Sequence, residues 1–313
     1  MPINGVLGPI ADDELGMTLM HEHVMTSSAG IWQTYPEVMG DVAAIERVAV
    51  DTLTAARGAG IRTIVDLTTM DLGRQIRFEE RVAREAGMQI VAATGVWLDV
   101  PRVMRFMQAD AIAALFIREL TDGIEDTGIR AGVIKVASDM EGVTDPARTI
   151  LVAAARAAAV AGVPIMTHSY SPGRVGEQQA DVLEAAGADP SRVVIGHSND
   201  TTDLDYLTGL LRRGFNLGLD RFPGRIGPDA AARTEVIQRL LDAGFGRQLI
   251  LSHDHVIASA SSGDDRARRQ AYNPDGYLYI SRHVVPRLRA PEPDTDLARL
   301  LLVDNPRRLF GGR

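Results

Sequence analysis

Lys135 is the residue of this sequence that most needs a chemical explanation. The chain has 33 lysine and arginine residues, and Lys135 is the only lysine among them. It lies in the apolar run 132–139, which is rich in β-branched residues and typical of a buried strand. Arginine stays protonated, whereas a buried lysine can lose its proton and act as a base, a nucleophile or a ligand precursor. We therefore predict a function that needs an uncharged or modified amine; the alternative is an outward-facing lysine whose amine reaches water.

Histidines and one carboxylate mark the ends of other predicted strands. The chain has seven histidines. Those that close or directly follow a strand, together with the aspartate at the end of the eighth strand, are His21, His23, His168, His197 and Asp254. Side chains at i and i+2 of a strand share a face, so His21 and His23 can point the same way. The same alternation predicts that His253 and His255 point away from Asp254, and His283 is predicted on the surface of a helix.

A regular alternation of short strands and amphipathic helices positions these residues. The predicted strands are 17–20, 61–67, 89–94, 132–139, 163–167, 193–196, 215–219 and 248–252, and the predicted helices are 42–57, 78–86, 109–124, 146–161, 177–186, 203–213 and 229–243, followed by helices at 277–288 and 297–310. Eight such units within about 250 residues predict an α/β fold, a (β/α)8 TIM barrel with a C-terminal helical tail. An open, doubly wound sheet is the alternative, but no glycine-rich phosphate fingerprint follows the first strand.

The carboxyl ends of barrel strands meet at one rim, where active sites lie. Four imidazoles, one carboxylate and Lys135 would therefore converge, which is the composition of a metal site. Six groups exceed the usual ligand set of one zinc ion but suit two metals roughly 3.5–4 Å apart. An ammonium cannot be a ligand. If the amine of Lys135 adds carbon dioxide, it becomes a carbamate that can bridge two metals, which arginine could not do.

Composition limits the other classes of function. The chain has 313 residues, a formal net charge of −8 and no cysteine. The charge gives no electrostatic support for nucleic-acid binding, and the lack of thiols leaves nitrogen and oxygen as the metal ligands. No signal peptide and no membrane-spanning run is visible, so the sequence predicts a soluble, cytoplasmic protein.

The motifs at the strand ends resemble those of the phosphotriesterase family of the amidohydrolase superfamily. The resemblance extends from about residue 8 to residue 310, and the segments that carry it are His21-Glu22-His23, residues 131–136 around Lys135, Thr167-His168, residues 195–198, Asp254, and the longer stretches 91–97 and 123–130. It implies one metal-dependent hydrolase barrel domain over residues 1–313, which acts on a small-molecule substrate and forms a homodimer.

The resemblance also implies the roles of the ligands. His21, His23 and Asp254 would bind a buried metal, and His168 and His197 a more exposed one, with carboxylated Lys135 and a hydroxide as bridges. Zinc is the usual metal, and cobalt, manganese or iron can replace it. The hydroxide would attack phosphorus or a carbonyl carbon, Asp254 would take the proton, and Asp200 matches an aspartate near the proton exit path.

Two positions suggest different substrates. Arg221 matches the arginine of lactonase-like members and stands where paraoxon-degrading members have a histidine of the proton relay. Trp97 matches organophosphate-degrading members, although it could also be plain barrel packing. Other pocket walls implied by the resemblance are Met25, Thr26, Leu72, Leu98 and Phe222. The polar segment 258–272 follows the eighth strand and is either a lid or a solvated loop.

The leading prediction is a metal-dependent hydrolase of lactones or carboxylic esters that also cleaves organophosphate triesters. The runner-up is a dedicated organophosphate hydrolase (aryldialkylphosphatase). A third alternative, a hydrolase of phosphorylated-sugar lactones or amides, would need several cationic pocket groups, of which the sequence offers Arg221 and Arg225. A non-catalytic binding scaffold would be a different class, and the complete set of ligands argues against it.

Overall fold

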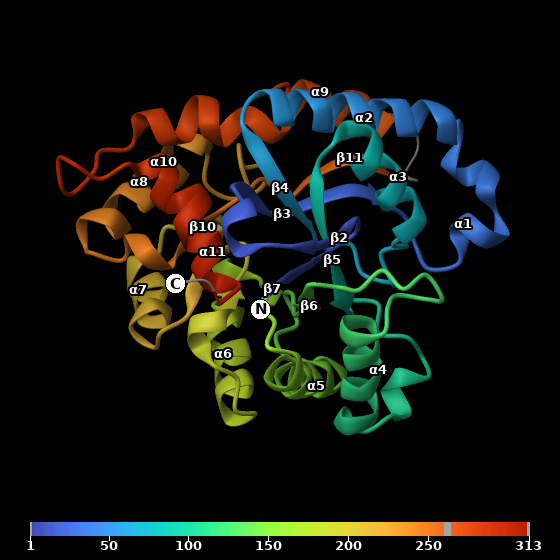
Figure 1. Cartoon of the computed structure of the whole chain (residues 1–313). Helices are drawn as coiled ribbons and strands as arrows, with labels where there is room; N and C mark the ends of the chain where they lie inside the picture. Colours follow the sequence, from blue (N-terminus) through green and yellow to red (C-terminus); the bar gives the residue numbers. More distant parts are fainter. Residues whose placement is uncertain (1, 260–263, 312–313) are drawn as a thin grey trace.

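The computed structural model describes residues 2–259 and 264–311. A curled sheet of parallel strands forms the middle of the molecule, with helices along its outside and a separate antiparallel pair of short strands within residues 3–10 (Figure 1). The strands are β1 (Ile3–Gly5), β2 (Gly8–Ile10), β3 (Met17–Thr26), β4 (Ile61–Asp66), β5 (Gln89–Gly95), β6 (Val133–Ala137), β7 (Ile165–His168), β8 (Val193–Ile195), β9 (Asn216–Leu219), β10 (Leu249–Leu251) and β11 (His255–Ser259). From β3 to β10 each strand pairs with the next one in the chain, which is the order of a (β/α)8 TIM-barrel-like fold.

The helices that follow these strands cover the outside of the sheet. The helices are α1 (Ile31–Thr34), α2 (Val42–Gly58), α3 (Ile76–Ala86), α4 (Ala109–Thr121), α5 (Asp145–Ala161), α6 (Val175–Ala185), α7 (Leu204–Arg212), α8 (Ala230–Asp242), α9 (Asp264–Tyr272), α10 (Leu297–Arg299) and α11 (Asn305–Leu309). Each of α2 to α8 buries one apolar face against the strands, as the 3.6-residue period of its sequence requires. The predicted fold class is therefore confirmed.

The interior of the barrel is a separate apolar layer. It contains one or two residues from most strands, among them Met20, Val65, Val91, Val133 and Met166. Because strand side chains alternate, Lys135 lies on the same inward face as Val133, one layer nearer the carboxyl rim. The lysine is 1% exposed, so the alternative of an outward-facing lysine is wrong.

The strand that closes the barrel is interrupted. Its first half, β10, pairs with β9, and its second half, β11, pairs with β3. Between the halves, the carboxylate of Glu22 accepts the main-chain N–H groups of His253 (3.0 Å) and His255 (3.1 Å), and Asp254 adopts a left-handed backbone with φ of 51°. The break places Asp254 at the rim and accounts for the ninth strand of the sheet.

Several predicted boundaries need correction. The first strand extends past the predicted 17–20 to Thr26, so His21 and His23 lie inside β3. Segment 258–272 is not a single loop, because β11 reaches Ser259 and α9 spans 264–272; residues 260–263 lie outside the described residues. Region 277–288 consists of short 3-10 and π turns, and the tail from 297 contains a π turn between α10 and α11. The β1–β2 hairpin was not predicted. Among the described residues, no helix is both long and apolar enough to cross a bilayer.

Candidate active site

Lys135 lies at the centre of the site. Its Nζ is 3.2 Å from Nε2 of His21 and 3.4 Å from the carbonyl oxygen of Thr167. Burial lowers the pKa of Lys135 to about 8, although the carboxylates of Asp220 and Asp254 act to raise it. A neutral amine is the form that reacts with carbon dioxide, so this environment brings the reactive form closer to neutral pH.

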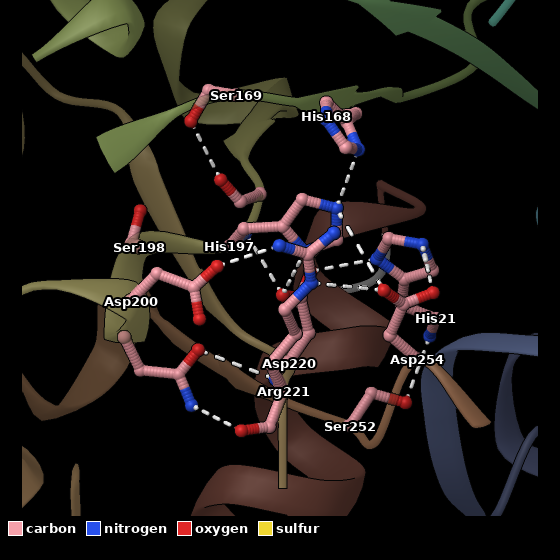
Figure 2. Close-up of polar contacts among 12 residues, drawn as sticks. His21, His168, Ser169, His197, Ser198, Asp200, Asp220, Arg221, Ser252 and Asp254 are labelled. Atoms are coloured by element: carbon pink, nitrogen blue, oxygen red, sulfur yellow. Dashed lines mark hydrogen bonds and ion pairs between the residues drawn. The ribbon is translucent and has the colours of Figure 1, made fainter. Parts of the chain in front are cut away.

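Four histidine nitrogens face the same space as this amine (Figure 2 shows three of the rings, those of His21, His168 and His197). Nε2 of His21 and Nε2 of His23 lie 3.5 Å and 3.3 Å from Oδ1 of Asp254. Nε2 of His197 lies 2.9 Å from Nδ1 of His168. The structure therefore brings together all six residues that the sequence predicts as ligands.

The opposite nitrogen of each imidazole has a partner outside this space. Nδ1 of His21 and Nδ1 of His197 donate to the two oxygens of Asp220, at 2.7 Å and 2.9 Å. Nδ1 of His23 lies 2.8 Å from the hydroxyl of Thr68, and Nε2 of His168 lies 3.6 Å from Oδ2 of Asp139. Histidines that bind metals almost always have such outer partners, which fix the tautomer and the ring orientation.

The charge state of the rings also suits metal binding. Burial lowers the pKa of His21, His168 and His197, that of His197 most strongly. All three are therefore neutral imidazoles near pH 7, and a neutral imidazole is the form that binds a metal.

Within the part of the chain that the structure describes, two groups of nitrogen and oxygen atoms are compact enough to hold an ion. One consists of His21, His23 and Asp254, and the other of His21, His197 and Asp220. In the second group the Asp220 oxygens already accept imidazole N–H groups, so we assign Asp220 to orienting the rings. The convergent nitrogens, the Asp254 oxygen and the buried amine fit the predicted binuclear metal site.

Arg221 joins the other two predicted catalytic residues, as Figure 2 shows. Its Nε donates to Oδ2 of Asp254 at 3.0 Å, and its Nη1 donates to Oδ2 of Asp200 at 2.6 Å. Burial acts to lower the pKa of Arg221, but the carboxylates of Asp254 and Asp200 raise it above its ordinary value. An arginine held in this way orients Asp254 but cannot relay a proton.

A cavity of about 540 Å³ opens beside this rim. Of the predicted pocket residues, Thr26, Trp97, Arg221 and Phe222 line it. Leu98 lines an adjacent cavity of about 490 Å³ instead, and Leu72 and Met25 are not among the described residues that line either cavity. The indole N–H of Trp97 points at the ring of His168, with 3.4 Å between Nε1 and Nδ1. Trp97 therefore contacts a candidate ligand as well as the pocket.

The remaining histidines have structural contacts. Nδ1 of His253 is 2.6 Å from the buried carboxylate of Glu22, and its Nε2 accepts the main-chain N–H of Ile280. His255 packs edge-on against Tyr277 and lines the wall of the pocket together with His253. His283 pairs with Asp275 at the surface, as predicted.

Sequence reasoning missed Asp220 and Asp139. Asp220 directly follows β9 and Asp139 lies two residues beyond β6, so both are at the rim where the predicted ligands were found. Their position just after a strand could have identified them as candidate site residues. Their partners are distant in sequence (His21 is 199 residues from Asp220), and only the folded chain shows the pairing.

The fold and the cluster at its carboxyl rim define a TIM-barrel-like protein with a candidate metal site. A model of the phosphotriesterase family matches residues 1–310, and the chain belongs to this family. It is 36% identical over 317 residues to a phosphotriesterase homology protein of Mycobacterium tuberculosis (98% of this chain, 97% of that one). It is 32% identical over 308 residues to an aryldialkylphosphatase of Saccharolobus solfataricus (96% of both chains). It is also 28% identical over 277 residues to an N-acetyltaurine hydrolase of Dictyostelium discoideum (84% and 72%).

Proposed function

We propose that this protein hydrolyses lactones or carboxylic esters with two divalent metal ions, usually zinc, and also cleaves organophosphate triesters. The observation that carries the proposal is the amine of Lys135, buried 3.2 Å from Nε2 of His21 within a group of imidazoles. His21, His23 and Asp254 would hold one ion, and His168 and His197 the other. Lys135 would bridge them after its nitrogen forms a bond to the carbon of carbon dioxide and releases a proton.

The bound ions would supply Lewis-acid polarisation of the scissile bond and a water activated near neutral pH. Asp254 would take a proton from the activated water, and the N–H of Arg221 that donates to its Oδ2 holds the carboxylate in place. Arg221 keeps the carboxylate aimed at the imidazoles and stays protonated throughout. The proton leaves to water in the pocket, and Asp200 holds the far side of Arg221 in place.

Part of the pocket wall is apolar, which suits a neutral ester or lactone. Trp97 and Phe222 give it aromatic surface, and the wall also contains Thr26 and Val256. Arg221, as in lactonase-like members, supports lactones, whereas Trp97 and the aryldialkylphosphatase relative support organophosphates. The dedicated organophosphate hydrolase remains the runner-up.

The test is a substrate panel on purified, zinc-loaded protein, with a chromogenic lactone, an aryl acetate and paraoxon, and with metal content measured on the same sample. We expect lactone and ester turnover at higher kcat/KM than paraoxon turnover. A kcat/KM that is higher for paraoxon would favour the runner-up. Protein that binds two metals and leaves all three substrates intact would refute the proposal.

A second candidate is a hydrolase of anionic esters or amides. The cavity is lined by Arg221, Arg225 and Arg269, while Asp254 is the one carboxylate among the described residues that line it. Arg221 is paired with Asp254 and Asp200, so Arg225 is the pocket cation that most favours the third alternative, and some relatives are named N-acetyltaurine hydrolases. Comparing an aryl acetate with the matching aryl monoester of succinate, and adding N-acetyltaurine, tests it. Preference for the charged members would favour this candidate.

The proposal also extends to a cytoplasmic homodimer, which the sequence and the family resemblance predict. Sedimentation equilibrium of the full chain measures the assembly, and a monomer at micromolar concentration would contradict it.

A further inference from the structure

Arg233 is a fully buried arginine that touches none of the candidate metal ligands. It lies on α8, one turn from the helix start, and its side chain is 0% exposed. A buried cation is costly unless opposite charge and hydrogen bonds compensate for the lost water. The environment of Arg233 therefore deserves an explanation of its own.

The guanidinium of Arg233 donates in several directions. Nη1 donates to Oδ1 of Asp200 at 2.8 Å and to the carbonyl of Asn199 at 2.6 Å. Nε donates to the carbonyl of Pro228 at 2.8 Å, and Nη2 donates to the carbonyl of Ile226. One side chain thus ties the segment after β8 to segment 222–228, the loop between β9 and α8.

Segment 222–228 is part of the pocket wall. Phe222, Gly224, Arg225 and Ile226 line the cavity of about 540 Å³. Ile226 is 62% exposed, so burial does little to fix this part of the segment. Among the described residues, no backbone–backbone hydrogen bond outside helices and strands involves residues 222–228. Two carbonyls of the segment, those of Ile226 and Pro228, accept hydrogen bonds from Arg233 instead.

Close packing supports the same conclusion. An ideal Cβ at Gly224 would lie 2.2 Å from Nε of Arg233, and the φ of Gly224 is +101°. The segment therefore passes directly over the guanidinium at a residue that has no side chain. The arrangement requires an arginine, because the three donors of a lysine start from one atom and cannot reach both carbonyls and the carboxylate.

Asp200 connects the contacts between Arg233 and segment 222–228 to the reaction centre. Its Oδ1 accepts from Arg233 and its Oδ2 accepts from Arg221, which in turn donates to Asp254. Four residues of alternating charge thus run from α8 to the rim. Arg221 donates to Asp254 and to Asp200 from different nitrogens, so Asp254 keeps its N–H donor when Arg233 is replaced, and the loss acts first on the pocket wall.

We propose that Arg233 is a positioning residue that holds wall segment 222–228 against Asp200 and thereby sets the preference for large over small substrates. The inference rests on the hydrolase activity proposed above. Replacing Arg233 should hardly change kcat/KM for substrates too short to reach the wall. Substrates with long or bulky acyl groups should bind less tightly once Arg233 no longer holds the wall segment.

The variants are Arg233→Lys and Arg233→Met, with Arg239→Met as the matched control. Arg239 lies on the same helix, its side chain is 60% exposed, and it pairs with Glu235 one turn away. If Arg233→Met does not fold, Arg233→Lys decides, because it keeps the charge and most of the volume. Metal content should stay at the wild-type level in all variants.

The first readout is kcat/KM for an aryl acetate and for an aryl ester of a long-chain acid. We expect the long-to-short ratio to fall about tenfold in Arg233→Lys, through KM of the long ester, with kcat for the acetate nearly unchanged. Arg239→Met should keep the wild-type ratio. An equal loss on both esters would mean that Arg233 has a general structural role, and it would overturn the proposal, as would an unchanged ratio.

The second readout needs no activity. Arg225 is an exposed trypsin site inside the wall segment. Cleavage after Arg225, identified by mass spectrometry, should be about tenfold faster in Arg233→Lys than in wild type or Arg239→Met, because it follows local opening. Unchanged cleavage would overturn the proposal. If wild type cleaves neither ester, the proposed function fails, while the rate of cleavage after Arg225 still decides whether Arg233 holds the wall.

Discussion

Replacing Asp220 by asparagine should prevent His21, one of the candidate ligands, from binding a metal, without changing the shape of the site. Asp220 is fully buried and accepts three N–H groups: Nδ1–H of His21 on Oδ2, and both Nδ1–H and the main-chain N–H of His197 on Oδ1. Asparagine has the same outline but offers one oxygen and one NH2 group. One of the two carboxylate positions must therefore change from acceptor to donor.

The structure indicates which position changes. The oxygen at Oδ1 faces two donors of His197, one of them a main-chain N–H that cannot move its proton. The amide should therefore keep its oxygen there and turn its NH2 towards Nδ1 of His21. His21 can then avoid two facing donors by moving its own proton to Nε2, the nitrogen that lies 3.2 Å from Lys135. A protonated Nε2 cannot bind a metal.

The expected loss of metal affinity follows from removing this hydrogen-bond partner of His21. Removing such a partner typically weakens metal binding by about 10–100-fold, which corresponds to about 1.4–2.7 kcal/mol. The metal-free protein should also lose stability, by about 1.5–3 kcal/mol, because a buried hydrogen bond to a charged group is lost.

The assay is metal content per chain after equilibration in buffers of fixed free zinc, with chemical unfolding of the metal-free protein alongside. The matched control is Asp181→Asn, since the side chain of Asp181 is 71% exposed and pairs with Arg213 at the surface. The control should match wild type in both measurements. If Asp220→Asn bound zinc as tightly as wild type, the assignment of Asp220 to ring orientation would be wrong.

Three further predictions concern neighbouring groups. Lys135→Arg should abolish metal binding and lower activity on the order of a thousandfold or more, because arginine cannot form a carbamate; two metals retained per chain would contradict the bridge. Arg221→His should shift the ratio of kcat/KM towards phosphotriesters, about tenfold, by replacing a fixed cation beside Asp254 with a titratable ring; an unchanged ratio would count against the role of Arg221. Gly95→Ala should destabilise the fold by at least about 1–3 kcal/mol in chemical unfolding, since its Cβ would lie 1.9 Å from the carbonyl oxygen of Lys135; wild-type stability would show that β5 and β6 can separate without cost.

Periodicity and chemistry predicted the parts of this molecule that depend on local sequence. The eight strand segments and their helices follow from alternating apolar runs. The ends of those strands identified His168 and His197, and Lys135 stood out as the only lysine, inside a predicted strand. Each of these signals lies within a few residues of the feature that it predicts. Boundaries were less accurate, as β3 shows, because His21 and His23 look polar in sequence yet are buried in a strand.

Groups whose role depends on a distant partner could not be predicted in the same way. An aspartate after a strand is common, and nothing near Asp220 in the sequence indicates that it will lie between two imidazoles. Arg233 looks like a surface residue of an amphipathic helix, and its burial depends on Asp200, 33 residues earlier. In both cases the evidence is a contact that exists only once the barrel has closed.

The break between β10 and β11 shows that the same contacts close the barrel and position Asp254 in the site. In a continuous strand, the side chain of Asp254 would follow the inward–outward alternation of its neighbours. Instead the main-chain N–H of Asp254 donates to the carbonyl of His21 at 3.0 Å, and its left-handed backbone turns the carboxylate towards the imidazoles. His197 has the same left-handed backbone, with φ of 56°. Aspartate and histidine are among the side chains that tolerate this conformation best. The residue types at these two positions therefore fit both the left-handed backbone and the proposed metal-binding role. A substitution that tolerates the backbone but cannot bind a metal, or the reverse, should impair the site.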